Sequence, residues 1–297
     1  TPGNALSDND SYLTALFPKE SQDSIEYGGF GISIPAGNVV TGIEVMLKSG
    51  TTTSRGLYVN LSWNGIDFTS DTKLANLTQT LIEHTLGSSS DLWGKAQWSS
   101  TELSNSNFWI KIKANDTYGA VFLDYIAVKV YYCIKPVATL PSNGDGSIDQ
   151  PYEIATLGNL YWIAANSTVW DKYFIQTADI DASETAEWCT GGWLPIGDKF
   201  PYQVLNRVFI GNYDGQEHSI TGLHITNSSS VAFGLFGYAA GATIQNLGII
   251  NVEITGVDGC AGGLVGYVES VKINNCYSTG SIATINSNDA GGLVGHQ

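Results

Sequence analysis

The chain repeats Gly234-Leu235-Phe236-Gly237 as Gly263-Leu264-Val265-Gly266 and again as Gly292-Leu293-Val294-Gly295, each time after 29 residues. Neighbouring positions keep the same step, because Ile244 recurs as Ile273 and Asn246 recurs as Asn275. A fixed period of this length is typical of solenoids, in which each repeat buries its apolar face against adjacent repeats. Each repeat holds about three short apolar strands, which predicts a triangular parallel β-helix whose turns are about 4.8 Å apart. We expect the two asparagines to form a hydrogen-bonded ladder along this stack.

The bulk composition restricts the classes of partner. The net charge is −15, with only 13 Lys and Arg residues. Nucleic acids and anionic membrane surfaces are bound by clustered basic side chains, so the charge argues against both. Charged residues make up 14% of the chain, against a usual value of about 25%, and the 34 glycines suit strands and tight turns. No apolar run approaches the roughly 18 residues of a membrane-spanning helix.

The first 133 residues predict an all-β module. Apolar and polar residues alternate over residues 43–48, 57–63, 108–113 and 126–130. This period of two is typical of strands that bury one face in a shared core. Several such segments, separated by turns rich in Gly, Ser and Asn, predict a β-sandwich.

A linker and a short helix are expected between this module and the repeats. Three prolines bracket a small polar run in residues 134–151, which predicts a linker. Apolar residues then recur at the spacing of an amphipathic helix, with Thr156 as its N-cap, and this helix would cover the first turn of the solenoid. The helical face comprises Leu157, Leu160, Tyr161 and Ala164. We therefore predict a sandwich over 1–133, a linker over 134–151 and a capped β-helix over 152–297.

The second half resembles the GLUG-repeat family of bacterial cell-surface and secreted proteins, from about residue 145 to 297. The motifs that carry the resemblance are Ala178–Asp181, Trp193–Gly197, Asp214–Ile220, Gly263–Gly266, Ile273–Ser281 and Gly292–Gly295. The resemblance implies a right-handed β-helix in an adhesin-like extracellular protein, usually without a defined enzymatic role. The first half is loosely similar to jelly-roll modules of bacterial extracellular and phage proteins, through Ser90–Gly94 and Asn107-Phe108.

Aromatic side chains are the first candidates for a binding site. Trp93, Trp98 and Trp109 could stack on a sugar or contact a protein partner. Trp109 stands out because its neighbours Phe108 and Ile110 are expected to point inward, which leaves its indole outward. The alternative is that all three tryptophans simply cover a sheet.

Acidic and histidine side chains are the second group of candidates. Asp179 and Asp181 share one face of a strand and could act as acid and base in a polysaccharide hydrolase or lyase. The alternative is that both carboxylates bind turn amides, and Asp214 is similarly expected in an Asx-turn. His218 and His224 lack a third ligand at zinc spacing.

The linker and the cysteines suggest two further features. Asp145, Asp149 and Glu153 have a spacing loosely like a calcium loop, although a solvated acidic linker is the default interpretation. At the 29-residue step Cys276 aligns with Leu247 and Cys260 aligns with Asp289, so a bridge between these two cysteines is not favoured. The remaining pair, Cys133 and Cys189, is a candidate disulfide between the end of the sandwich and the first loop of the solenoid.

These observations favour an extracellular structural or adhesive protein without a cofactor. The chain reaches His296 and Gln297 directly after its third glycine motif, so the last turn is expected to present an unpaired edge at Gly292, Leu293, Val294 and Gly295. Such an edge is a template for another strand and predicts head-to-tail self-association. The alternatives are a polysaccharide-active enzyme and a glycan-binding module.

Overall fold

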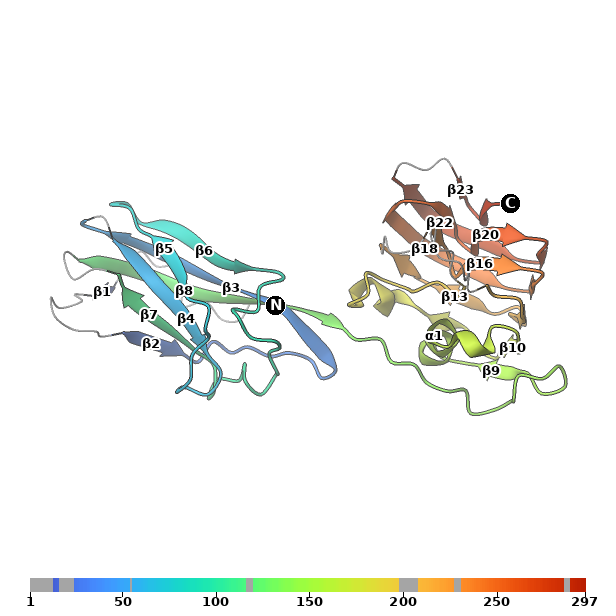
Figure 1. The fold of residues 1–297 in the computed structure, drawn as a ribbon, viewed down its shortest axis with the longest axis horizontal. Helices are drawn as coiled ribbons and strands as arrows, with labels where there is room; N and C mark the ends of the chain where they lie inside the picture. The colour runs from blue at the N-terminus through green and yellow to red at the C-terminus, as the bar shows by residue number, and fades with distance from the viewer. Residues whose placement is uncertain are drawn as a thin grey trace. The chain divides into compact units, whose positions relative to one another are not determined.

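The computed structural model describes residues 13–15, 24–53, 55–115, 120–197, 208–226, 231–285 and 289–297. The chain divides into two compact units, Thr1–Cys133 and Ile134–Gln297. Strands dominate both units, with one α-helix and two short 3-10 helices among the described residues (Figure 1). The prediction of an all-β protein is therefore confirmed.

The first unit contains two four-stranded sheets. One has the order β1 (Leu13–Ala15), β8 (Val121–Ile134), β3 (Asn38–Thr51) and β6 (Ile82–Ser88). The other has the order β2 (Ile25–Gly28), β7 (Trp109–Ala114), β4 (Gly56–Ser62) and β5 (Lys73–Asn76). Antiparallel pairing joins β1 to β8, β3 to β6, β2 to β7, and β4 to both β5 and β7.

One apolar core joins strands from both sheets of the first unit. Ile43, Val45 and Leu47 of β3 are fully buried, as are the alternating apolar residues of β4. Their polar neighbours point the other way, as a pleated strand with one buried face requires. The predicted period-two alternation is therefore observed in both strands.

The second unit begins with the segment predicted as a linker and with the helix α1 (Leu157–Ala165). The backbone N–H of Thr139 donates to the Gly158 carbonyl at 2.9 Å, so the segment 134–151 is attached to the unit that follows it. The hydroxyl of Thr156 accepts from the Asn159 backbone N–H at 3.1 Å, which confirms the predicted N-cap. The helix buries Leu160 in the core of this unit.

The rest of the second unit consists of stacked parallel strands. One sheet has the order β21 (Lys272–Asn274), β17 (Thr243–Gln245), β12 (Asn212–Asp214), β10 (Tyr173–Gln176) and β9 (Tyr152–Ile154). Another has the order β11 (Ile180–Asp181), β13 (Ser219–Thr221), β18 (Gly248–Val257) and β14 (His224–Ile225), with β22 (Tyr277–Thr284) paired to β18. Two three-stranded sheets are β15 (Ala232–Phe233), β19 (Cys260–Gly262) and β23 (Ala290–Gly291), and β16 (Phe236–Ala240), β20 (Val265–Glu269) and β24 (Val294–His296). The 3-10 helices η1 (Ser167–Val169) and η2 (Ser183–Glu187) lie between the early strands.

The 29-residue step is the pairing register of these sheets. Phe236 pairs with Val265, and Val265 pairs with Val294. Ile244 pairs with Ile273 by the same step. The glycine-flanked segments are therefore stacked directly over one another, in the register that the repeat predicts.

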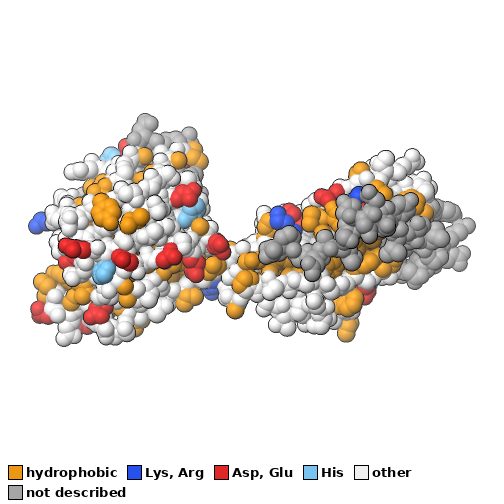
Figure 2. Space-filling model, turned by 180° about the vertical axis from the view of Figure 1, so that it is seen from behind, with side chains coloured by type: hydrophobic (Ala, Val, Ile, Leu, Met, Phe, Trp, Pro, Cys, Tyr) orange, Lys and Arg blue, Asp and Glu red, His pale blue; other side chains and the backbone are white. Residues whose placement is uncertain are grey.

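The surface and the helices add two observations. Figure 2 shows Asp and Glu side chains spread singly over the visible face of the second unit, in keeping with the net charge of −15. No described helix is long and apolar enough to cross a membrane.

Candidate functional site

Trp93 and Trp98 do not form an exposed binding platform, which corrects the sequence prediction. Their exposed fractions are 0% and 2%. The indole N–H of Trp93 donates to the Ile43 carbonyl at 2.9 Å, and that of Trp98 donates to the Leu92 carbonyl at 2.9 Å. Both lie in the segment between β6 and β7, and both rings belong to the buried core of the first unit.

Trp109 is half-buried on the outer face of β7. A side chain at Gly28 would lie 2.8 Å from its ring, so the indole covers the neighbouring strand β2. Its ring N–H donates to the Ser106 carbonyl at 3.3 Å. This position agrees with the alternative in which Trp109 covers a sheet.

Asp179 and Asp181 are each engaged in local hydrogen bonds. The backbone N–H of Ser219 donates to Asp179 at 2.8 Å, and this bond, together with one from the Ser219 hydroxyl, lowers the pKa of Asp179. Ser183 likewise lowers the pKa of Asp181 by hydrogen bonding to its carboxylate. Neither carboxyl group has the raised pKa that a general acid needs at neutral pH.

Asp214 begins a polar ladder that runs across three successive repeats. Asn246 Nδ2 donates to Asp214 Oδ1 at 3.0 Å, and Asn275 Nδ2 donates to Asn246 Oδ1 at 3.0 Å. Partial burial opposes ionisation of Asp214, but bonds from Asn246, Gln216 and Gln245 lower its pKa. The predicted asparagine ladder is confirmed, and Asp214 also accepts from the Gln216 backbone N–H at 2.9 Å, as an Asx-turn requires.

A groove of about 260 Å³ lies over the sheet that carries Asp214. Tyr173, Asn212, Asp214 and Gln245 line it from three adjacent parallel strands, and the exposed Ile148 lies at its border. The groove therefore combines aromatic residues with the amides of Asn212 and Gln245 and the carboxylate of Asp214.

The other predicted ligand sets do not converge. His218 approaches Asp179 at 3.5 Å, whereas His224 approaches Glu253 at 3.4 Å. The side chains of Asp145, Asp149 and Glu153 do not place three ligand atoms within 4.8 Å of one another. Among the described residues, one different set of three side chains meets this distance. Asp145 accepts from the Ser147 backbone N–H, and Glu153 accepts from the Asn143 side chain, so the proposed calcium loop is held by its own hydrogen bonds.

That one set is Cys260, Asp289 and His296, which the sequence analysis did not recognise as a site. Two pairs of residues related by the 29-residue step involve members of this set. Cys260 aligns with Asp289, and Tyr267 aligns with His296. The first alignment places Cys260 beside Asp289, but neither alignment brings His296 to this pair.

The cysteines fall into two pairs. Cys133 and Cys189 are each disulfide-bonded, whereas Cys260 and Cys276 are thiols outside any disulfide. Ile134, which follows Cys133, forms a parallel bridge with Trp188, which precedes Cys189. The backbone N–H of Cys189 donates to the Ile134 carbonyl at 2.9 Å.

We expect non-reducing peptide mapping to recover Cys133 and Cys189 in one cross-linked peptide, because the bridge at Ile134 and Trp188 aligns the two segments. Alkylation before digestion should label Cys260 and Cys276 in the same sample. Recovery of both Cys133 and Cys189 as alkylated thiols would reject the pairing.

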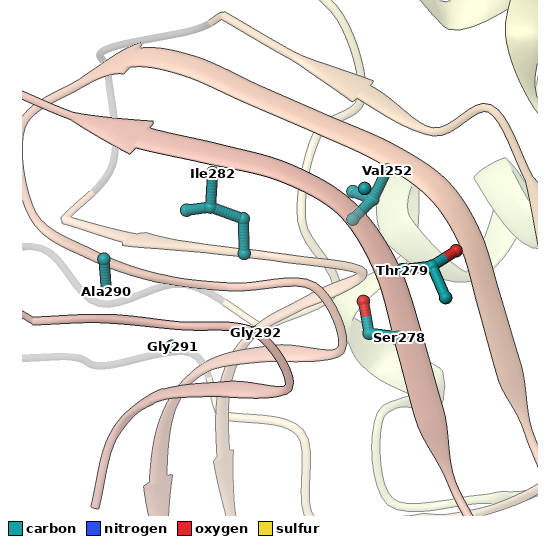
Figure 3. Close-up of a pocket in the computed structure, with 8 residues that line it drawn as sticks. Val252, Ser278, Thr279, Ile282, Ala290, Gly291 and Gly292 are labelled. Atoms are coloured by element: carbon teal, nitrogen blue, oxygen red, sulfur yellow. The ribbon is translucent and has the colours of Figure 1, made fainter.

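Four edge strands of the second unit, β21, β22, β23 and β24, lie in the last described repeat. β21, β23 and β24 each end the order of their sheet, and β22 pairs only with β18 among the described strands. A cavity of about 320 Å³ opens between β22 and β23, lined by Val252, Ser278–Gly280, Ile282 and Ala290–Gly292. In Figure 3 the side chains of Ile282 and Ala290 lie on facing sides of this cavity. A side chain at Gly292 would meet nothing within 4 Å.

Comparison with known proteins gives limited matches. No protein-family profile matches the chain. The chain is 39% identical over 97 residues to halomucin of Haloquadratum walsbyi, a stretch that is 32% of this chain and about 1% of the length of halomucin.

Two solved structures show low similarity to this chain. The catalytic unit of a thermostable GH87 alpha-1,3-glucanase from Streptomyces thermodiastaticus is 12% identical, with a TM-score of 0.21, over 92% of this chain and 66% of that one. Another GH87 alpha-1,3-glucanase catalytic domain, in complex with tetrasaccharides, is 11% identical with a TM-score of 0.18, over 94% of this chain and 54% of that one. Scores this low carry no argument about fold or activity.

Proposed function

We propose that the chain is an extracellular structural or adhesive protein that associates through the edge strands β21–β24. In this proposal the first unit is a jelly-roll-like β-sandwich. The second is a short right-handed parallel β-helix of the GLUG-repeat type, covered at one end by α1 and open at the other.

The edge strands β21–β24 of the last described repeat are the observation that carries the proposal. The edge strands present backbone groups on a side where no described strand pairs with them, and they border a cavity lined by both polar and apolar residues. Unpaired strand edges are templates for further strands. A second copy that docks its own surface on this end would form a heterologous, head-to-tail contact.

Three observations support an extracellular location. Cys133 and Cys189 are disulfide-bonded, and disulfides persist mainly in oxidising compartments. The low charged fraction of 14% and the many small polar residues suit an exposed β-protein. The partial similarity to halomucin agrees with this location.

We expect the full chain to form oligomers or fibres, and Ile282→Lys to abolish them. Ile282 continues the apolar column of Ile225 and Ile254 and lines the open cavity. In the Ile282→Lys variant, a second copy that docks on this end would bury the unpaired ammonium group of the new lysine. That burial costs several kcal/mol and weakens association by roughly 100-fold or more. Light scattering during size-exclusion chromatography and electron microscopy measure the outcome.

Ala283→Lys is the matched control, because Ala283 is the next residue on the same strand and its side chain is exposed. We expect this variant to assemble as the unaltered chain does. A chain that stays monomeric at high concentration, without fibres, contradicts the proposal.

A further inference from the structure

A thiol, a carboxylate and an imidazole meet beside the cavity end of the second unit. Cys260 Sγ lies 3.6 Å from Asp289 Oδ2, and His296 Nδ1 lies 3.2 Å from the same oxygen. One ligand atom from each residue lies within 4.8 Å of the others. The side chains of Asp289 and His296 are 47% and 40% exposed, so an ion in solution can reach the group.

The separations fit a tetrahedral metal centre. Zinc binds thiolate sulfur at about 2.3 Å and imidazole nitrogen or carboxylate oxygen at about 2.0–2.1 Å. At tetrahedral angles these bonds set the sulfur and oxygen about 3.5 Å apart and the nitrogen and oxygen about 3.3 Å apart. The observed distances of 3.6 and 3.2 Å lie close to both values.

The repeat register holds the three donors in place. The backbone N–H of Ala261 donates to the Asp289 carbonyl at 2.9 Å, which fixes Asp289 over Cys260 in the next repeat. His296 pairs with Tyr267 across β20 and β24, and the two rings stack with centroids 4.8 Å apart and planes 9° apart. This stacking fixes the orientation of the imidazole before any ion binds, as a metal ligand requires.

We propose that Cys260, Asp289 and His296 form a Zn²⁺ site that clamps successive repeats together. A soft thiolate combined with an imidazole selects zinc over the hard cations Ca²⁺ and Mg²⁺. The three side chains supply three ligands, and the fourth position is open to solvent. One repeat earlier, the residues at the positions of Cys260, Asp289 and His296 are Ala232, Cys260 and Tyr267, which lack this donor set.

The test is a metal titration of the full chain, cleared of metal with a chelator and kept free of thiol reductants. We expect one Zn²⁺ per chain in competition with a chromophoric chelator, and an increase in the thermal midpoint of the second unit when zinc is present. Co²⁺ substituted for Zn²⁺ should give a sulfur-to-metal charge-transfer band. Cys260→Ser and His296→Ala should each raise the Zn²⁺ dissociation constant by roughly 100-fold or more, because losing a ligand exceeds the effect of losing a supporting contact.

Cys276→Ser is the matched control, because Cys276 is the other thiol outside a disulfide and its sulfur donates to backbone carbonyls. It should leave both the stoichiometry and the Co²⁺ band unchanged. Zinc binding that survives both Cys260→Ser and His296→Ala, or no binding by a chain that is folded by circular dichroism, would overturn the site. In that case the three side chains form only a hydrogen-bonded surface cluster.

Discussion

Replacing Phe236 by alanine should lower the free energy of unfolding of the second unit by about 3–5 kcal/mol. The side chain is fully buried on β16. Its ring lies 4.8 Å from the ring of Phe209 and 5.8 Å from that of Tyr213, both of which are also buried. Truncation removes the apolar contacts and leaves a cavity between layers that cannot collapse without breaking the strand register.

Hydrogen exchange followed by mass spectrometry, at increasing urea, would measure this loss in the peptides of the second unit. Val294→Ala is the control, because Val294 belongs to the same column as Phe236 but lies at the open end and is only half-buried. Val294→Ala should lower the free energy of unfolding by less than about 1 kcal/mol, because the side chain of Val294 buries less apolar surface on folding than that of Phe236 does. Equal losses in the two variants would show that the column is not a continuous core.

The stacked strands were predictable because the 29-residue step of the sequence repeat is also the step that separates paired residues in the sheets. A step of 29 residues relates both the apolar pair Ile244 and Ile273 and the polar pair Asn246 and Asn275, and both pairs are adjacent in the sheets. In a solenoid each repeat contacts mainly its neighbours, so local sequence similarity reports spatial contact directly.

Trp93 and Trp98 were wrong candidates for an exposed platform because their environment depends on contacts far along the chain. Trp93 donates to the carbonyl of Ile43, 50 residues earlier. Neither Trp93 nor Trp98 lies on a strand, so no alternation pattern indicates which way the ring points. Tryptophan at a loop position is equally consistent with an exposed platform and with a buried ring whose N–H finds a carbonyl.

The Cys260, Asp289 and His296 group was missed for a different reason. The alignment of Cys260 with Asp289 indicates only that Cys260 and Cys276 lie in different columns, so that a bridge between them is not favoured. The chain bends at Gly292 and Leu293, which brings β23 and β24 side by side and so sets Asp289 near His296. That proximity arises from the turn geometry, which the period alone does not specify.

Gly266→Ala should destabilise the second unit by about 3 kcal/mol, at the upper end of the cost of overpacking. A methyl group at this position would press against the backbone nitrogen of Phe233 and would lie 2.8 Å from the carbonyl carbon of Ala232. These are main-chain atoms of the preceding repeat, so relief requires separating two hydrogen-bonded layers. A side chain at Gly295 would likewise lie 2.6 Å from the backbone nitrogen of Ala261, which explains physically why the final glycine of the motif recurs.

Gly292→Ala is the matched control for Gly266→Ala, because Gly292 belongs to the same motif but a side chain there would meet nothing within 4 Å. We expect its free energy of unfolding to stay within about 0.5 kcal/mol of the unaltered chain. Both variants make the same chemical change, so intrinsic glycine-to-alanine effects on the unfolded chain largely cancel in the comparison. If Gly266→Ala unfolds at the same urea concentration as Gly292→Ala, then the close approach of stacked backbones does not explain why glycine recurs at this position. The motif would then need another explanation, such as turn conformation.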